Sequence, residues 1–156
     1  MTETLAALKM KQQTDSLAVA LFSEILTVDQ LARNNVAKAL PKGMELSHFS
    51  VLNHLARTQE EKTPAQLAQI FHLTRGAMTN TLRKLETSGY VHIRPDWDDA
   101  RRKMVTISPT GRSARDAALA AIAPIIARAV GKIGYEKVRA ILPVMRELRV
   151  NLSEED

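Results

Sequence analysis

A row of polar residues between Thr74 and Lys84 has the residue types needed to contact the edges of DNA bases. Asparagine pairs with adenine and arginine with guanine through two hydrogen bonds each, so Asn80 and Arg75 are chemically able to read bases. Apolar residues recur between them at helical spacing and predict the buried side of the same helix. The candidate DNA-contacting residues of this segment are Thr74, Arg75, Gly76, Thr79, Asn80, Arg83 and Lys84. An amphipathic surface helix without a ligand would show the same pattern.

A second group of charged residues lies between Arg94 and Lys103, where acids and bases alternate in a short loop. Acids beside a phosphate-binding surface are unfavourable unless each has a positional role. Asp99 and Arg101 are two residues apart, so the carboxylate can fix the guanidinium and aim it outward. An arginine held in this way can enter a narrow minor groove, whose potential attracts it. The candidate DNA-contacting residues of the loop are Arg94, Asp99, Arg101 and Arg102.

The net positive charge of the chain is confined to one segment. Residues 62–112 hold nine Lys or Arg and four Asp or Glu, which is a net charge of +5, and the whole chain also carries +5. The remaining residues therefore sum to zero. A local basic excess is typical of a surface that binds nucleic acid, although a solvated basic face without a partner would look the same.

The elements that must position these residues are mostly helices. Apolar spacing predicts a first helix over 17–36, ending before Pro41. Ser47 is a candidate cap for a second helix, Thr63 for a third running to about Ile70, and Thr74 for a fourth ending at Gly89. Residues 91–94 and 103–107 alternate apolar and polar residues, which predicts a hairpin. Two further helices should follow, one from Ser108 to about 130 and one from about 135 to 152, with Pro124 and Pro143 as irregularities.

Two short helices joined by about four residues and followed by a hairpin with a charged tip form a winged helix-turn-helix. We therefore predict a mainly α fold with a small β-hairpin wing. Such a lobe inserts the N-terminal end of its second helix into the major groove, which is about 12 Å wide. The sequence accordingly predicts a DNA-binding lobe over residues 47–107.

Composition excludes several other classes. The chain of 156 residues has no cysteine, which removes disulfide scaffolds, thiol nucleophiles and cysteine zinc sites. No apolar run approaches the ~20 residues that span a bilayer, and no signal peptide is apparent, so we expect a cytoplasmic protein with no membrane partner. No two of the four histidines have the i, i+4 spacing of a helical metal site. We find no catalytic motif, and therefore predict no enzyme activity, no metal and no cofactor.

Several segments together resemble the MarR family of bacterial transcription regulators. Leu67-Ala68 is similar to a step in the helix before the family's recognition helix, and Leu85-Glu86 followed by Gly89-Tyr90-Val91 resembles the motif after it. The wing motif is matched by Arg94-Pro95-Asp96, Asp99-Ala100-Arg101 and Ile107-Ser108-Pro109-Thr110-Gly111. The likeness departs at Asn80, where a basic residue or histidine is frequent, and at Gly76, where proline or serine is common.

The resemblance implies a homodimer that binds double-stranded DNA. In the family the outer helices interlock, which here predicts a dimerisation region over 1–40 and 108–156 within a single domain of residues 1–156. The resemblance further implies a pseudo-palindromic operator, repression of transcription, and release from DNA by a small anionic aromatic effector.

Two other functions remain open at this point. A winged helix can serve as a protein-interaction module without sequence-specific DNA binding, although the basic balance and the charged wing favour DNA. An enzyme without a recognisable motif would keep its activity after loss of Arg75 and Arg101.

Overall fold

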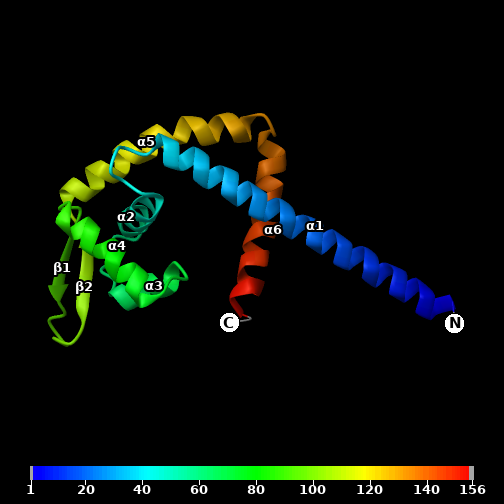
Figure 1. Cartoon of the computed structure of the whole chain (residues 1–156), viewed down its shortest axis with the longest axis horizontal. Coiled ribbons are helices and arrows are strands. Elements are labelled where there is room, and N and C mark those ends of the chain that lie inside the picture. The colour runs from blue at the N-terminus through cyan, green and yellow to red at the C-terminus, as the bar shows by residue number, and fades with distance from the viewer. Residues whose placement is uncertain (1, 155–156) are drawn as a thin grey trace. The chain divides into compact units, whose positions relative to one another are not determined.

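The computed structural model describes residues 2–154. The chain divides into two compact units, one ending at Lys38 and one beginning at Ala39. The first unit is formed by α1 (Thr2–Ala39). The second contains the other elements: α2 (Leu46–Thr58), α3 (Pro64–Ile70), α4 (Arg75–Thr87), β1 (Val91–Pro95), β2 (Lys103–Ile107), α5 (Pro109–Gly131) and α6 (Tyr135–Glu154) (Figure 1). This order confirms a mainly helical fold with a hairpin wing.

The first helix is much longer than predicted. The expected start at residue 17 was wrong, because α1 already begins at Thr2. Residues 2–16 lack a helical apolar stripe as clear as the one that follows, but they are rich in alanine, leucine, lysine and glutamine and contain no glycine or proline. Such residues favour a helix through intrinsic propensity alone. The predicted end before Pro41 is confirmed.

The predicted cap of the second helix was also wrong. Helix α2 begins at Leu46 with Glu45 in the N-cap position, so Ser47 lies inside the first turn. The backbone N–H of Glu45 donates to His48 Nδ1 at 3.1 Å. In a capping box, the residue three positions after the cap accepts this hydrogen bond and is usually glutamate or glutamine; here it is a histidine. This use of a histidine ring could not be read from the sequence.

The three other predicted helix starts are confirmed. The Thr63 hydroxyl accepts from Gln66 N at 3.1 Å, and the Gln66 side chain accepts from Thr63 N at 2.8 Å. The Thr74 hydroxyl accepts from Ala77 N at 3.1 Å. Helices α3 and α4 therefore begin where local hydrogen bonding dictates, and the turn between them is correspondingly short.

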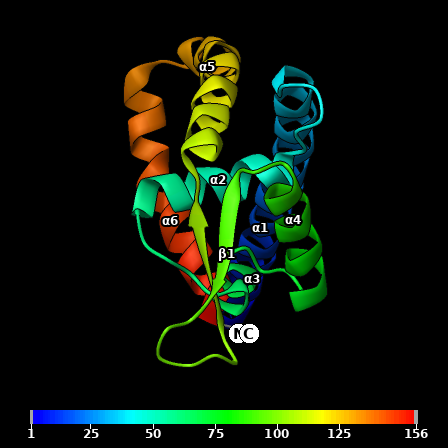
Figure 2. The ribbon, with the colours of Figure 1, turned by 90° about the vertical axis from the view of Figure 1, so that its left-hand side faces the viewer.

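The hairpin is a two-stranded antiparallel sheet in which Val91 pairs with Ile107 and Pro95 with Lys103. A single bridge between Lys62 and Val105 adds the segment before α3 to its edge. Figure 2 shows the loop between the strands extending beyond the helices of the second unit.

One apolar cluster holds this lobe together. Met78, Leu82 and Leu85 of α4 are at most 2% exposed. They share the cluster with side chains of α2, α3 and the hairpin, namely Val51, Leu52, Leu55, Leu67, Ala68, Val91 and Val105. Burying a leucine contributes about 1.5–3 kcal/mol, so the cluster fixes which side of α4 faces solvent.

The hairpin is closed at its base by contacts between Gly89-Tyr90 and the start of α5. Ser108 N donates to Tyr90 O at 2.9 Å, and the Ser108 hydroxyl donates to Gly89 O at 2.6 Å. The same hydroxyl accepts from Gly111 N at 2.9 Å. A Cβ at Gly111 would lie 2.0 Å from Tyr90 O. The backbone of α5 therefore approaches β1 so closely that only glycine fits.

We predict that Gly111→Ala lowers the free energy of unfolding by at least about 1–3 kcal/mol, since overpacking forces the backbone apart. Gly131→Ala is the matched control, because Gly131 is also in α5 and a Cβ there meets nothing within 4 Å. The control should be neutral or slightly stabilising. Urea unfolding of the three proteins measures the difference, and equal midpoints for Gly111→Ala and wild type would contradict the packing argument.

Candidate nucleic-acid interface

The exposed surface of α4 consists of two rows of side chains. Arg75, Thr79 and Arg83 follow one another at four-residue spacing and form the first row. Gly76 and Asn80 begin the second row, which continues to Lys84. All of these residues are exposed, as is the capping residue Thr74. The predicted recognition helix therefore presents its polar residues to solvent, while the apolar cluster holds its opposite side.

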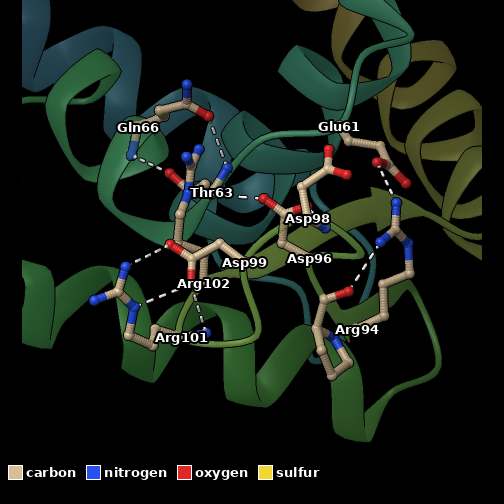
Figure 3. A network of polar contacts seen from close by, with 10 residues as sticks. Glu61, Thr63, Gln66, Arg94, Asp96, Asp98, Asp99, Arg101 and Arg102 are labelled. Carbon is tan, nitrogen blue, oxygen red and sulfur yellow. Dashed lines mark hydrogen bonds and ion pairs between the residues drawn. The ribbon is translucent and has the colours of Figure 1, made fainter.

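The tip of the wing is ordered by its acidic residues (Figure 3). Asp96 N donates to Arg102 O at 2.9 Å and closes the loop, and Asp98 N donates to the Asp96 carboxylate at 3.1 Å. Arg102 Nε lies 3.8 Å from Asp96 Oδ2. Aspartates commonly stabilise turns by accepting from nearby backbone amides. Arg102, a predicted DNA contact, thus has an acidic partner within the tip, although its side chain remains exposed.

The predicted pair between Asp99 and Arg101 is present. Arg101 Nε donates to Asp99 Oδ1 at 3.1 Å, and Arg101 Nη2 donates to Oδ2 at 3.2 Å. The carboxylate also accepts from Arg101 N at 3.1 Å. The Arg101 side-chain and then backbone hydrogen bonds hold the pKa of Asp99 below its ordinary value. The Arg101 side chain nevertheless remains 91% exposed. The guanidinium is therefore directed by its neighbour and still open to a ligand.

Residues from α4 and the wing converge on two adjacent hollows. One, of about 380 Å³, is lined by Arg75 and Thr79 together with Arg101 and Arg102. The other, of about 360 Å³, is lined by Thr79 and Arg83 together with Arg94. The structure thus brings the first row of α4 and the wing cations to one surface. Gly76 and Asn80 lie on α4 outside these hollows.

Two of the predicted DNA contacts are paired with glutamates that lie outside the two hollows. Lys84 Nζ lies 3.5 Å from Glu45 Oε1 at the start of α2, on the side of α4 away from the wing hollows. Arg94 is bound to Glu61, which precedes α3. Neither pairing has a local pattern that reveals it, because the partners are 39 and 33 residues apart in the sequence.

One cation at this surface was not predicted. Lys103 lines both hollows beside the arginines, and its side chain is exposed. Its position follows from the register of the hairpin, in which Lys103 opposes Pro95. In an ideal strand, Lys103 and Val105 lie on the same side, so the alternation of residues 103–107 does not identify Lys103 as an exposed residue of this surface.

Among the described residues, no group of three or more His, Cys, Asp or Glu side chains is placed to hold a metal ion. Burial is the main cause that lowers the pKa of both His48 and His54. Because His48 Nδ1 accepts a hydrogen bond, its neutral form carries the proton on Nε2, which has no partner among the described residues.

The comparisons with known proteins agree with this geometry. A sequence model of the MarR family matches residues 42–102, which include α2, α3, α4 and most of the wing. No individual curated protein matches the sequence.

Solved structures share the fold over most of the chain. The transcriptional regulator BldR from Sulfolobus solfataricus has a TM-score of 0.77 at 23% identity, covering 86% of this chain and 95% of BldR. A cysteine-to-serine mutant of MarR from E. coli, complexed with operator DNA, has a TM-score of 0.74 at 20% identity and coverages of 84% and 94%. The organohalide-sensing regulator RdhR in its 2,4-dichlorophenol-bound form has a TM-score of 0.76 at 18% identity and coverages of 86% and 80%.

These findings show which fold the chain shares with solved structures. The fold is the winged helix of MarR-family transcriptional regulators, and the segment 42–102 matches the family in sequence as well. The fold and this segment therefore resemble those of a family of transcriptional regulators. No single described helix is long and apolar enough to cross a membrane; α5 and α6 reach that length and composition only as a pair, bent by 104°.

Proposed function

We propose that this chain is a sequence-specific double-stranded DNA-binding transcription regulator that acts as a repressor. The convergence of Arg75 and Thr79 of α4 with Arg101 and Arg102 of the wing carries this proposal. Helix and wing together present cations on one surface, as binding to a groove and its flanking phosphates requires. The similarity in fold to MarR bound to operator DNA supports the same conclusion.

The alternative is a winged helix that binds another protein without reading DNA. The core of a protein–protein interface is depleted of charged residues other than arginine and is enriched in several aromatic side chains. The surface of α4 and the wing instead carries five arginines and Lys103 around its two hollows, and Trp97 is its one exposed aromatic residue among those described. This composition favours a polyanionic partner.

We further propose a homodimer formed by α1, α5 and α6. Large apolar side chains are exposed along α1 and α6, among them Leu17, Leu26, Ile141 and Leu142. None of the described side chains of α6 is fully buried. Contiguous exposed apolar patches of this kind mark association surfaces. Two winged lobes related by a two-fold axis would bind a pseudo-palindromic operator.

The dimer proposal predicts sedimentation at twice 17.3 kDa at micromolar concentration. Leu142→Asp should shift the protein to monomer or unfolded chain, because an aspartate would be buried without a partner. Asn151→Asp is the control, since position 151 is nine residues further along and lies on the opposite side of α6, where it is exposed. A stable wild-type monomer, or equal behaviour of the two variants, would contradict the proposal.

We also propose release from DNA by a small anionic aromatic effector. A hollow of about 380 Å³ between the loop before α2, α4 and α5 is lined by Lys42, Lys84 and His48. Two cations and a histidine whose Nε2 lacks a partner suit a small carboxylate or phenolate. The 2,4-dichlorophenol-bound form of RdhR, which shares the fold, supports a phenolic ligand. We further propose that the protein acts in the cytoplasm, as a regulator of transcription.

Selection of bound fragments from the source genome tests the central proposal and supplies the operator. The expected result is one enriched motif with half-sites about 10 bp or a multiple of that apart. Arg75→Ala and Asn80→Ala should each cost about 1–3 kcal/mol and relax preference at particular positions. Lys84→Ala, on the flank of the same helix, should change preference at none. Absence of any enriched motif would contradict sequence-specific binding.

The pair between Asp99 and Arg101 generates a prediction that opposes simple electrostatics. Asp99→Ala should weaken operator binding although it removes a negative charge, because Arg101 then loses its fixed direction. Arg101→Ala should weaken binding and reduce the salt slope by about one counterion. The double variant should be little worse than Arg101→Ala alone.

Asp98→Ala is the matched control for this cycle. It removes the same charge from the same loop, and the Asp98 carboxylate makes no hydrogen bond among the described residues, so binding should stay equal or tighten slightly. Titrations of one operator at several salt concentrations measure all five proteins. Tighter binding by Asp99→Ala, or additive losses in the double variant, would show that the pair does not act as a unit.

A further inference from the structure

Arg94 differs from the other arginines of the wing because its guanidinium is occupied within the lobe (Figure 3). Nη2 donates to Glu61 Oε2, and Nη1 donates to Pro95 O at 2.9 Å. The guanidinium carbon also lies 4.8 Å from the centre of the Trp97 ring. Only 29% of the Arg94 side chain is exposed, against 91% for Arg101. Three partners thus use both the edge and the face of this guanidinium.

Glu61 belongs to a segment that is already joined to the hairpin. The neighbouring residue Lys62 exchanges two backbone hydrogen bonds with Val105, at 3.2 and 2.8 Å, and Val105 is fully buried. Thr63 follows and caps α3. Glu61 is therefore held between the core strand of the wing and the start of the helix-turn-helix. Its carboxylate can therefore fix Arg94 without further ordering of the backbone.

Trp97 lies at the other end of this chain of contacts. Its ring is 81% exposed and its described neighbours in the loop are charged, so the apolar cluster does not hold it. A guanidinium over the face of an indole contributes about 0.5–1 kcal/mol at an exposed site. Arg94 therefore connects the tip of the wing to the segment before α3.

We propose that Glu61 and Trp97 are positioning residues that act through Arg94 to set the direction of the wing. This inference rests on the proposed DNA-binding function. Glu61 holds Arg94 against the body of the lobe, and Arg94 holds the tip through Trp97 and the Pro95 carbonyl. The tip then meets the duplex in one orientation, which lowers the entropy lost on binding. The two acid–arginine pairs of the wing have different tasks, since Asp99 directs Arg101 outward and Glu61 retains Arg94.

Two variants separate this role from a direct contact with DNA. Glu61→Ala removes a negative charge near the duplex, so a bystander carboxylate would leave affinity equal or raised. The positioning role instead predicts an affinity loss of about three- to fivefold, the size expected for one half-exposed ion pair. Arg94→Lys keeps the charge but loses the planar fork and the stacked face. A phosphate-contacting Arg94 would tolerate that change, whereas a positioning Arg94 loses affinity as Glu61→Ala does.

Glu60→Ala is the control, because Glu60 lies in the same loop, carries the same charge and pairs with Lys62 instead. It should change operator affinity less than twofold. Trp97→Phe should lose about two- to threefold, since phenylalanine offers a weaker π-face to the cation. The salt slope should remain that of the wild type in Glu61→Ala, because no phosphate contact is removed.

A second measurement needs no DNA. Trp97 is the only tryptophan in the chain, so time-resolved anisotropy of its fluorescence reports motion of the wing tip alone. The amplitude of the fast depolarisation should rise in Glu61→Ala and Arg94→Lys and stay at the wild-type value in Glu60→Ala.

The two measurements have distinct outcomes. Increased tip motion together with weaker operator binding in Glu61→Ala and Arg94→Lys supports the inference. Unchanged Trp97 anisotropy, equal or tighter binding by Glu61→Ala, or equal losses in the Glu60 and Glu61 variants would overturn it. If the wild-type protein selects no operator, the proposed function fails, and the anisotropy still decides whether Glu61 and Arg94 hold the tip.

Discussion

The burial of one side of α4 is the constraint on which the rest of the lobe depends. Met78, Leu82 and Leu85 pack into a cluster with residues of α2, α3 and the hairpin. Their burial fixes the orientation of α4 about its own axis. In this orientation of α4, the row of Arg75, Thr79 and Arg83 faces the wing. Because the same cluster includes Val91 and Val105, it also fixes the root of the hairpin. One core thus positions both the helix and the wing. Their cations lie on one surface because their apolar sides pack into the same cluster.

The wing shows how acidic residues can serve a surface that we propose to bind an anion. A free arginine on a loop has many rotamers, and ordering it on binding lowers affinity. Asp99 removes part of that cost in advance for Arg101, which remains open to solvent. Arg94 and Glu61 lie further back and connect the loop to the body of the lobe. In a count of positive charges along the sequence, Arg94, Arg101 and Arg102 are equivalent. In the structure each has a different acidic partner, and the partner determines the role of the arginine.

Local hydrogen-bonding patterns in the sequence predicted much of the fold, but they could not predict contacts between distant residues. The caps at Thr63, Thr74 and Ser108 were predictable because each involves residues three apart. The start of α2 was not, since a histidine ring replaces the usual acceptor there. The pair Asp99–Arg101 followed from a spacing of two residues. The engagement of Arg94 by Glu61 and of Lys84 by Glu45 depends on tertiary packing, which no local pattern encodes.

The central claim is that α4 and the wing form one DNA-reading surface, used twice by a symmetric dimer. Hydroxyl-radical footprinting on the selected operator tests it most directly, because the radical reports protection of the minor groove nucleotide by nucleotide. We expect a two-fold symmetric footprint in which wild-type protein protects two minor-groove segments outside the half-sites read by α4. Arg101→Ala should lose those outer segments and keep the inner protection. A footprint without symmetry, or one that Arg101→Ala leaves unchanged, would contradict the account.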